Sequence, residues 1–261
     1  MSATVINGGL VHYEAFGRGK PVIFVHGWLG SWRYWMRTME ALASDYRTYA
    51  LDLWGFGDSD KSRERYSVVD YTALLYDFMD GLGISQASLV GHALGATIGL
   101  RFATHNPERV CRLATVSLPI TPNAISGRLL DFASNSFLAK TFWWRQITHK
   151  EVQQEAEKMA ENVISLSVQS VVEVDVPALI QQVPQLTLAV YGEKDNVVDP
   201  TPVRALDGQR ANVRSIGLAE SRHFPMLEEA NKFNRLLKDF LEVGDDLSVL
   251  ELKEEWKRRT R

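Results

Sequence analysis

The chain has 261 residues, with 45% hydrophobic and 23% charged residues and a formal net charge of -3 at pH 7. This length allows one α/β domain with a buried sheet, and the mild acidity gives no reason to expect nucleic acid or an anionic membrane as a partner. No apolar run approaches the roughly 18 residues of a membrane span, and the N-terminus has no signal-peptide pattern, so a cytoplasmic protein is expected.

No cofactor and no metal site is predicted. Cysteine and histidine residues do not occur at metal-ligand spacing, no G-x-G-x-x-G follows a strand, and no P-loop is present. The single cysteine, Cys111, cannot form an internal disulfide. Its apolar surroundings, from Val110 to Val116, predict a buried and inert thiol.

The first part of the chain favours strands and one helix. Residues 4–15 alternate around the turn Asn7-Gly8-Gly9, which predicts two antiparallel strands. The continuous apolar run 21–25 predicts a strand covered on both faces. Residues 32–42 then predict a helix, and residues 48–53 predict the next buried strand.

Alternation of strand and helix continues to about residue 118. Residues 71–82 predict an amphipathic helix, residues 87–90 a short strand, and residues 98–103 a buried helix. Residues 109–118 predict another buried strand. This order predicts a mostly parallel central sheet with helices on both faces, which is an α/β fold.

From Pro119 the pattern changes. Residues 120–183 contain helical pieces at 124–134 and 150–163 and a concentration of aromatic side chains. Strands return at 185–191 and 212–218, and residues 224–241 predict a closing helix. The charged tail, residues 243–261, predicts a surface helix, a subunit contact or a disordered segment, which leaves a homodimer open.

The segment Gly91-His92-Ala93-Leu94-Gly95 has the spacing of a G-x-S-x-G nucleophile elbow, with alanine at its centre. Such a turn holds its central residue in a strained conformation, and the two glycines remove clashes that side chains would cause. The turn of a nucleophile elbow is therefore present without the nucleophilic hydroxyl, and the methyl side chain of Ala93 cannot act as a nucleophile.

Four further motifs follow the other predicted strands in a fixed order: His26-Gly27-Trp28, the D-x-x-G-x-G-x-S segment 52–59, Gly192 to Asp195, and Ser221 to Met226. His26 is expected to bond neighbouring backbone, and Asp52 and Ser59 to bond N–H groups of their loop. Together with the elbow, these motifs resemble the α/β-hydrolase superfamily, specifically its small capped esterase and lipase-like members, over residues 4–242.

The resemblance implies an α/β-hydrolase fold with a short helical cap inserted after the sixth strand. Residues 1–119 and 184–242 would form the core, and residues 120–183 the cap. It also implies a triad at Ala93 (the nucleophile position), Asp195 and His223, with His223 as general base and Asp195 orienting its ring. Asp199 is the competing acid, ranked second.

The backbone N–H groups of Trp28 and Leu94 would form the oxyanion hole. The predicted cap implies an apolar substrate pocket. The predicted pocket residues are Trp28, His92, Phe132, Phe137, Phe142, Trp143 and Phe224.

The resemblance predicts a serine-hydrolase-type esterase that cleaves a small apolar ester through an acyl-enzyme. Serine is favoured as the parent nucleophile because Leu94 stands where enzymes with an aspartate nucleophile usually place tryptophan. We favour a nucleophile-to-alanine replacement that inactivates this chain. A natural, non-catalytic ligand-binding relative is the alternative, and a perhydrolase, haloperoxidase-like or carbon-carbon bond hydrolase parent is also open.

Overall fold

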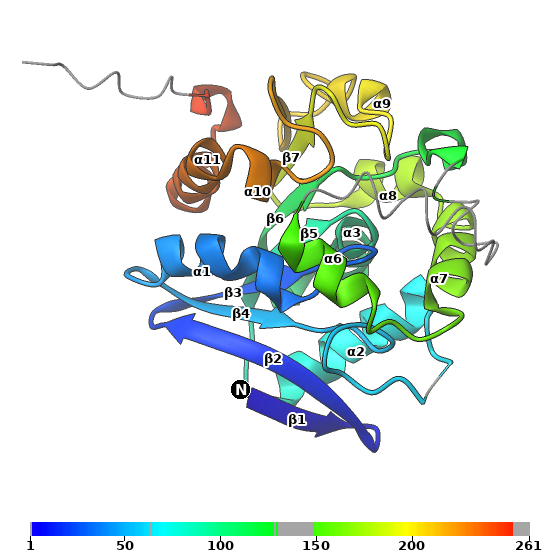
Figure 1. Ribbon diagram of the computed structural model, residues 1–261. Coiled ribbons are helices and arrows are strands. Elements are labelled where there is room, and N and C mark those ends of the chain that lie inside the picture. Colours follow the sequence, from blue (N-terminus) through cyan, green and yellow to red (C-terminus); the bar gives the residue numbers. More distant parts are fainter. Residues whose placement is uncertain (1, 63, 128, 130–148, 253–261) are drawn as a thin grey trace, which may run out of the picture.

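The computed structural model describes residues 2–62, 64–127, 129 and 149–252 (Figure 1). In this part of the chain an eight-stranded sheet has the order β1-β2-β4-β3-β5-β6-β7-β8. The strands are β1 (Ser2–Ile6), β2 (Gly9–Gly17), β3 (Lys20–Val25), β4 (Tyr46–Leu51), β5 (Ala87–His92), β6 (Val110–Val116), β7 (Thr187–Gly192) and β8 (Val213–Leu218). The expected mostly parallel sheet is confirmed, since only the pairs β1–β2 and β2–β4 are antiparallel.

The N-terminal hairpin follows the expectation from Asn7-Gly8. Asn7 and Gly8 have positive φ angles of 49° and 78°. Ile6 pairs with Gly9, so Asn7 and Gly8 are the two residues of the turn. Positive φ at both turn positions matches the right-handed twist of the flanking strands, which explains the choice of asparagine and glycine.

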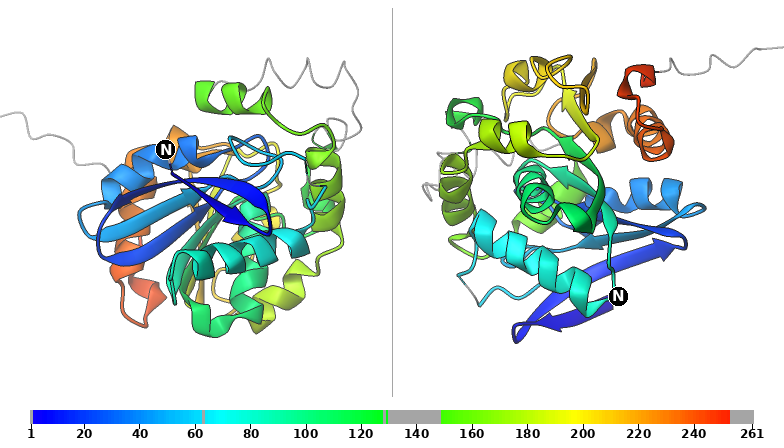
Figure 2. Two further views of the ribbon diagram at one scale, coloured as in Figure 1. Left: turned by 90° about the horizontal axis from the view of Figure 1, so that it is seen from below. Right: turned by 180° about the vertical axis from the view of Figure 1, so that it is seen from behind.

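Helices cover both faces of the sheet (Figures 1 and 2). The helices are α1 (Met36–Leu42), α2 (Val68–Gly81), α3 (Leu94–His105), α6 (Lys150–Ala156), α7 (Val163–Val172), α8 (Val176–Gln182), α9 (Thr201–Arg204), α10 (Pro225–Glu228) and α11 (Ala230–Glu242). Helix α1 packs against α11, whereas α2 and α8 pack against α3. The central strands β5 and β7 are buried along their whole length, as strands between two helical layers must be.

Several predicted helices are broken in the structure. The predicted helix 32–42 is a 3-10 helix, η1 (Trp32–Trp35), followed by α1. The predicted helix 150–163 ends at Ala156, and the N–H of Ala160 donates to the carbonyl of Gly55 rather than one turn back. The closing helix is interrupted at Glu229, whose carboxylate accepts hydrogen bonds from the Glu220 N–H and the Ser221 hydroxyl.

The segment between β6 and β7 carries α6, α7 and α8. A 3-10 helix, η3 (Pro122–Ala124), precedes it, and Ile125 forms a bridge to Val198 instead of continuing the predicted helix 124–134. Farther along the predicted helix the Leu129 N–H donates to the Ser126 carbonyl, and residues 128 and 130–134 lie outside the described residues. Helix α7 contacts both α2 and α3.

Two expectations about the surface are wrong. The charged tail was expected on the surface, but Leu247, the first residue of η4 (Leu247–Val249), and Leu250, directly after it, are buried. Cys111 is exposed, because its position in β6 alternates away from the core. The apolar neighbours of Cys111 therefore predicted the wrong face of the strand for its side chain.

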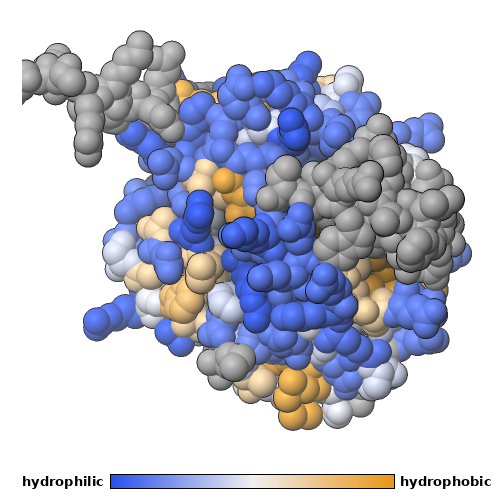
Figure 3. Space-filling model, viewed as in Figure 1, coloured by the Kyte–Doolittle hydropathy of each residue, from blue (hydrophilic) through white to orange (hydrophobic). Residues whose placement is uncertain are grey.

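The face shown in Figure 3 is mostly hydrophilic, with smaller hydrophobic areas between the charged regions. Exposed large apolar side chains of the described residues come from different elements, among them Val5 and Leu10 of the hairpin and Val69 of α2. Within the described chain no single helix has the length and apolar character to cross a membrane, and only α7 and α8, bent by 62°, pass that test as a pair.

Candidate active site

The backbone at Ala93 has the strained geometry that the elbow motif predicts. Ala93 stands between β5 and α3 with φ 47° and ψ -108°, and its N–H donates to the Val116 carbonyl at 2.8 Å. A Cβ at Gly91 would lie 2.2 Å from the Gly95 carbonyl oxygen, so the turn excludes a side chain there. Positive φ at a non-glycine residue is costly and persists only where the surroundings impose it.

His223 and Asp195 form a buried hydrogen-bonded pair. The His223 Nδ1 lies 2.9 Å from the Asp195 Oδ2, and the two side chains are 6% and 1% exposed. Asp195 Oδ1 also accepts the backbone N–H groups of Val197 and Val198. Burial alone would raise the pKa of the Asp195 carboxyl, but the His223 imidazole and these hydrogen bonds hold that pKa below its ordinary value. Asp195 is therefore an anion that fixes the orientation of the His223 ring.

The competing acid, Asp199, has a different place. Its carboxylate is bonded to the N–H of Thr201, at the start of α9. The residue is exposed, whereas the Asp195 side chain is buried against His223. The structure thus brings His223 together with Asp195.

The loop that carries His223 is bonded to the elbow. His92, which directly precedes Ala93, donates from Nε2 to the His223 carbonyl at 2.8 Å, and the two imidazole rings are 4.6 Å apart. The Ser117 hydroxyl donates to the same carbonyl at 3.4 Å. These contacts place the His223 loop, which follows β8, against the turn that follows β5.

The loop after β3 lies beside the elbow. A Cβ added to Gly27 would lie 3.0 Å from the Cβ of Ala93. Among the described residues the backbone N–H groups of Trp28 and Leu94 have no hydrogen-bond partner, and Leu94 is the first residue of α3. Free N–H groups at a helix start and in an adjacent loop are the donors that an oxyanion needs.

His26 supports this loop, as the sequence suggested. Its Nδ1 donates to the Gly27 carbonyl at 2.8 Å, and its Nε2 accepts the Leu53 N–H at 2.9 Å. Burial lowers the pKa of His26, which fits a neutral ring with one donor and one acceptor. His26 is therefore fully used in holding backbone.

The predicted pocket residues have separate placements. The indole Nε1 of Trp28 donates to the Ser167 hydroxyl of α7 at 3.0 Å, so its side chain joins the loop to that helix. His92 lies between Tyr34 and the His223 backbone with both ring nitrogens engaged. Phe224 packs against the rings of His92 and His223, with centroids 5.2 Å and 5.1 Å away. The remaining predicted pocket residues, Phe132, Phe137, Phe142 and Trp143, lie outside the described residues.

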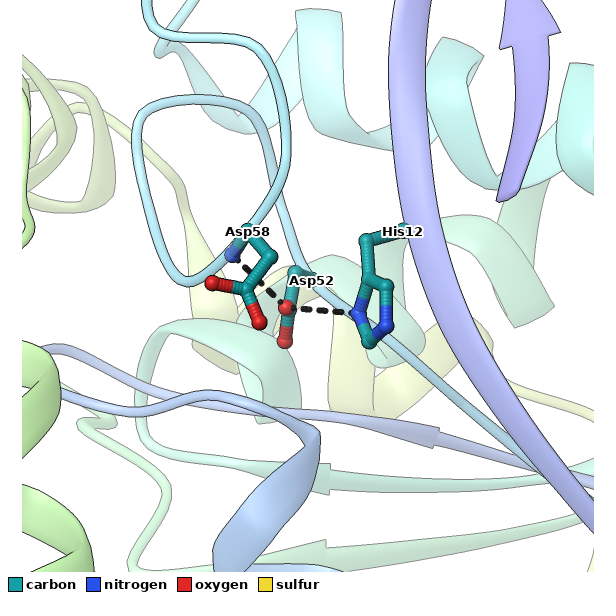
Figure 4. Close-up of side chains that lie close together, drawn as sticks. All are labelled: His12, Asp52 and Asp58. Atoms are coloured by element: carbon teal, nitrogen blue, oxygen red, sulfur yellow. Dashed lines mark hydrogen bonds and ion pairs between the residues drawn. The ribbon is translucent and has the colours of Figure 1, made fainter. Parts of the chain in front are cut away.

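A second histidine-aspartate pair was missed by the sequence analysis. His12 Nδ1 lies 3.0 Å from Asp52 Oδ2, close to Asp58 (Figure 4). The pairing of β2 with β4 brings these residues together, since Tyr13 lies opposite Leu51 and the Asp52 N–H donates to the His12 carbonyl. Strand alternation alone did not reveal the contact; the register of the two strands was needed.

The three side chains of this cluster are already engaged in ion pairs. Ligand atoms of His12, Asp52 and Asp58 lie within 4.8 Å of one another. However, Asp58 is already paired with Arg33 at 2.9 Å and with Lys158 at 3.5 Å. These two cations supply the positive charge that a metal ion would otherwise provide. Asp52 accepts the Asp58 N–H of its own loop, as predicted, and also the N–H of Trp32. The prediction is wrong for Ser59, whose hydroxyl accepts the N–H of His12 in β2 and donates to the Asp52 carbonyl.

A family model described as alpha/beta hydrolase fold matches residues 20–148. The chain belongs to the α/β-hydrolase superfamily. This confirms the resemblance carried by the motifs. A hydrolase from Pseudomonas aeruginosa PA01 superposes with a TM-score of 0.82 and 18% sequence identity, covering 93% of this chain and 98% of that one. The superposition confirms the α/β-hydrolase fold.

Several curated relatives of the chain are hydrolases. The chain is 27% identical over 255 residues to a pimeloyl-[acyl-carrier protein] methyl ester esterase from Aeromonas hydrophila, a match covering 88% of this chain and 99% of that protein. It is 33% identical over 140 residues to epoxide hydrolase 4 from Mus musculus, covering 52% of this chain and 39% of that protein. These relatives support a hydrolase function for this chain.

Proposed function

We propose that the site is that of a carboxylic ester hydrolase working through an acyl-enzyme, with alanine in place of its serine nucleophile. The observation that carries this proposal is the strained backbone of Ala93, with φ 47°, kept beside the His223–Asp195 pair. With ψ -108° the residue also lies outside the small left-handed α region, and an alanine side chain gains nothing from that conformation. The strain therefore fits a turn that was built for a nucleophile.

With serine at position 93 the chemistry would run in two balanced steps. The hydroxyl oxygen attacks the ester carbonyl carbon while His223 Nε2 accepts its proton, and the N–H groups of Trp28 and Leu94 bind the oxyanion. Collapse breaks the bond to the alcohol oxygen, which takes the proton from His223. Water, deprotonated by His223, then attacks the acyl carbon, and the serine oxygen leaves with that proton.

Asp195 would keep His223 in the tautomer with its proton on Nδ1, so that Nε2 is free to accept. Its depressed pKa supports this role, because an ionised carboxylate stabilises the imidazolium that forms in each step. Alanine at position 93 removes the attacking oxygen and leaves the rest. The chain should then bind an ester without cleaving it, apart from a small residual rate.

The bond that is cleaved can be tested by restoring a nucleophile. Ala93→Ser should hydrolyse p-nitrophenyl acetate or butyrate, whereas Ala93→Asp, the nucleophile type of epoxide hydrolases, should not open styrene oxide. Absence of hydrolysis of esters, thioesters and amides by folded Ala93→Ser would reject the proposal. Epoxide opening by Ala93→Asp alone would assign the site to epoxides.

A natural ligand-binding protein is the second candidate, and Ala93 itself favours it. In that case the unaltered chain should be stabilised by an apolar metabolite that is not an ester, since a ligand that binds only the folded state raises the unfolding midpoint. A thermal-shift screen of esters, their acids and their alcohols separates the candidates. Stabilisation confined to ester-like compounds supports the hydrolase proposal.

A further inference from the structure

Tyr34 and His92 link three loops of the site through one buried chain of hydrogen bonds. The Gly27 N–H donates to the Tyr34 hydroxyl oxygen at 2.5 Å, and this hydroxyl lies 3.1 Å from His92 Nδ1. His92 Nε2 lies 2.8 Å from the His223 carbonyl oxygen. Tyr34 and His92 are 1% and 0% exposed, so water does not compete for these bonds.

The chemistry of the atoms sets the direction of every bond. A carbonyl oxygen only accepts, so His92 Nε2 carries a proton and donates to His223. In a neutral ring Nδ1 then accepts, and the Tyr34 hydroxyl donates to it while accepting from Gly27. Burial, followed by repulsion from His223, holds the pKa of His92 well below its ordinary value, which agrees with a neutral ring. The Tyr34 oxygen and His92 Nδ1 each accept one bond in this chain, while the His223 carbonyl accepts from both His92 and the Ser117 hydroxyl.

The Tyr34 ring also supports the loop after β3 by direct packing. A Cβ at Gly30 would lie 2.3 Å from Tyr34 Cε1, so this loop runs closely over the ring, with Gly27 bonded to its hydroxyl. On its other side the ring meets His92 edge-on, with centroids 5.5 Å apart. The phenol therefore fills the space between the loop of Trp28 and the elbow.

We infer that Tyr34 and His92 are positioning residues that set the His223 loop and the Gly27–Trp28 loop at fixed distances from residue 93. His92 adjoins residue 93 in the chain, so its bond to the His223 carbonyl ties the proposed base to the elbow. Tyr34, bonded to the N–H of Gly27 and to the His92 imidazole, links the loop that carries the proposed oxyanion donor of Trp28 to His92. The catalytic consequence rests on the proposed function, whereas the hydrogen-bonded support itself does not.

Removing the Tyr34 hydroxyl leaves the Gly27 N–H and His92 Nδ1 without partners in a buried region, so both loops should relax. Small displacements of catalytic groups lower the rate of the chemical step more than they weaken binding. Tyr34→Phe in the Ala93→Ser chain should therefore lower kcat about tenfold and change KM by less than about threefold.

Tyr71→Phe is the matched control. Tyr71 is equally buried, and its hydroxyl donates one bond, to the Trp54 carbonyl at 2.9 Å. It lies on α2, and among the described residues its hydroxyl makes no hydrogen bond to Gly27, Tyr34, His92 or His223. Both variants lose one buried hydroxyl, and Tyr34→Phe leaves two groups unpaired where Tyr71→Phe leaves one, but only Tyr34→Phe should lower kcat per folded molecule.

The two ends of the His92 ring can be separated by substitution. The amide N–H of His92→Gln can still donate to the His223 carbonyl, whereas His92→Leu cannot. In the Ala93→Ser chain, His92→Gln should keep several times more activity than His92→Leu at equal folded fraction. Equal kcat for Tyr34→Phe, His92→Leu and the Ala93→Ser parent, with each variant folded, would overturn the inference.

Nitrogen-15 NMR tests the support in the unaltered chain, without any activity. Long-range ¹H–¹⁵N spectra should show His92, assigned with the His92→Gln variant, as the neutral Nε2–H tautomer, and Tyr34→Phe should shift its Nδ1 resonance. A His92 proton on Nδ1, or titration near pH 6.5, would overturn the inference. If Ala93→Ser proves inactive, the proposed function fails, and these spectra alone decide whether the support exists.

Discussion

The molecule contains two buried histidine-aspartate pairs with nearly the same geometry and different surroundings. His223–Asp195 and His12–Asp52 are joined through Nδ1 at 2.9 Å and 3.0 Å. Both carboxylates also accept two backbone N–H groups. The pairs differ in what lies next to the imidazole, since the loop of His223 is bonded to the residue before Ala93.

The surroundings of Nε2, the ring nitrogen that does not bond the aspartate, also distinguish His12 from His223. His12 Nε2 lies 3.5 Å from Glu14 Oε1, so carboxylates face both ends of that ring. Its hydrogen bond to Asp52, opposed by burial and aided by the charges of Asp58 and Glu14, raises the pKa of His12. A histidine held between two carboxylates is stabilised in its protonated form and contributes to the stability of the fold. A histidine-aspartate contact therefore becomes a candidate catalytic pair only where a strained turn and free N–H donors adjoin it.

The largest difference is expected when each histidine is removed in the Ala93→Ser chain. His223→Ala should lower the ester hydrolysis rate at least about a thousandfold, because the base is lost. His12→Ala should leave kcat within about twofold but lower the free energy of unfolding by about 2 kcal/mol, because Asp52 loses a buried partner. Initial rates and urea unfolding measure the two effects. Comparable losses of kcat would remove the distinction between the pairs.

The two candidate acids give the next largest effect. Asp195→Asn should lower kcat in the Ala93→Ser chain by about 100-fold or more, because the His223 ring loses the anion that fixes its tautomer. Asp199→Asn should leave kcat unchanged, since Asp199 is exposed and bonded to Thr201. Rates are compared at equal folded fraction. A larger loss at Asp199 would make it the acid of the site.

These sites also show what the sequence could predict. Gly91, Gly95 and the two strand-end positions Asp195 and His223 were found because local motifs at βα spacing carry them. The Tyr34–His92 contact and the His12–Asp52 pair were missed because they join segments 58 and 40 residues apart. Strand register and side-chain direction decide such contacts, and a single sequence states neither.

The predicted end of one helix and the predicted burial of Cys111 were wrong for a related reason. The predicted helix 150–163 has helical composition, but the Ala160 N–H is taken by the Gly55 carbonyl. Cys111 lies in an apolar stretch of β6 yet faces solvent. In both cases a tertiary contact or the pleat of the strand outweighs local preference.

The smallest expected effect is a pH dependence of stability at His12. Its pKa is raised in the folded chain, so the added stability is fully present below the unfolded value of 6.5 and is lost as pH rises through the folded pKa. His12→Asn keeps an N–H donor near the Nδ1 position but does not titrate. The free energy of unfolding of the unaltered chain relative to His12→Asn should fall between pH 6 and 9, by roughly 1 kcal/mol. A constant difference across this range would contradict the charged pair.

The most direct test of the central claim is covalent trapping at position 93. Diethyl p-nitrophenyl phosphate should release p-nitrophenolate and leave one diethylphosphoryl group on the Ala93→Ser protein, located by peptide mass spectrometry at residue 93. The unaltered chain should stay unmodified, and the Ala93→Ser, His223→Ala double variant should react far more slowly. A folded Ala93→Ser protein that stays unmodified, or that carries the group elsewhere, would contradict the account.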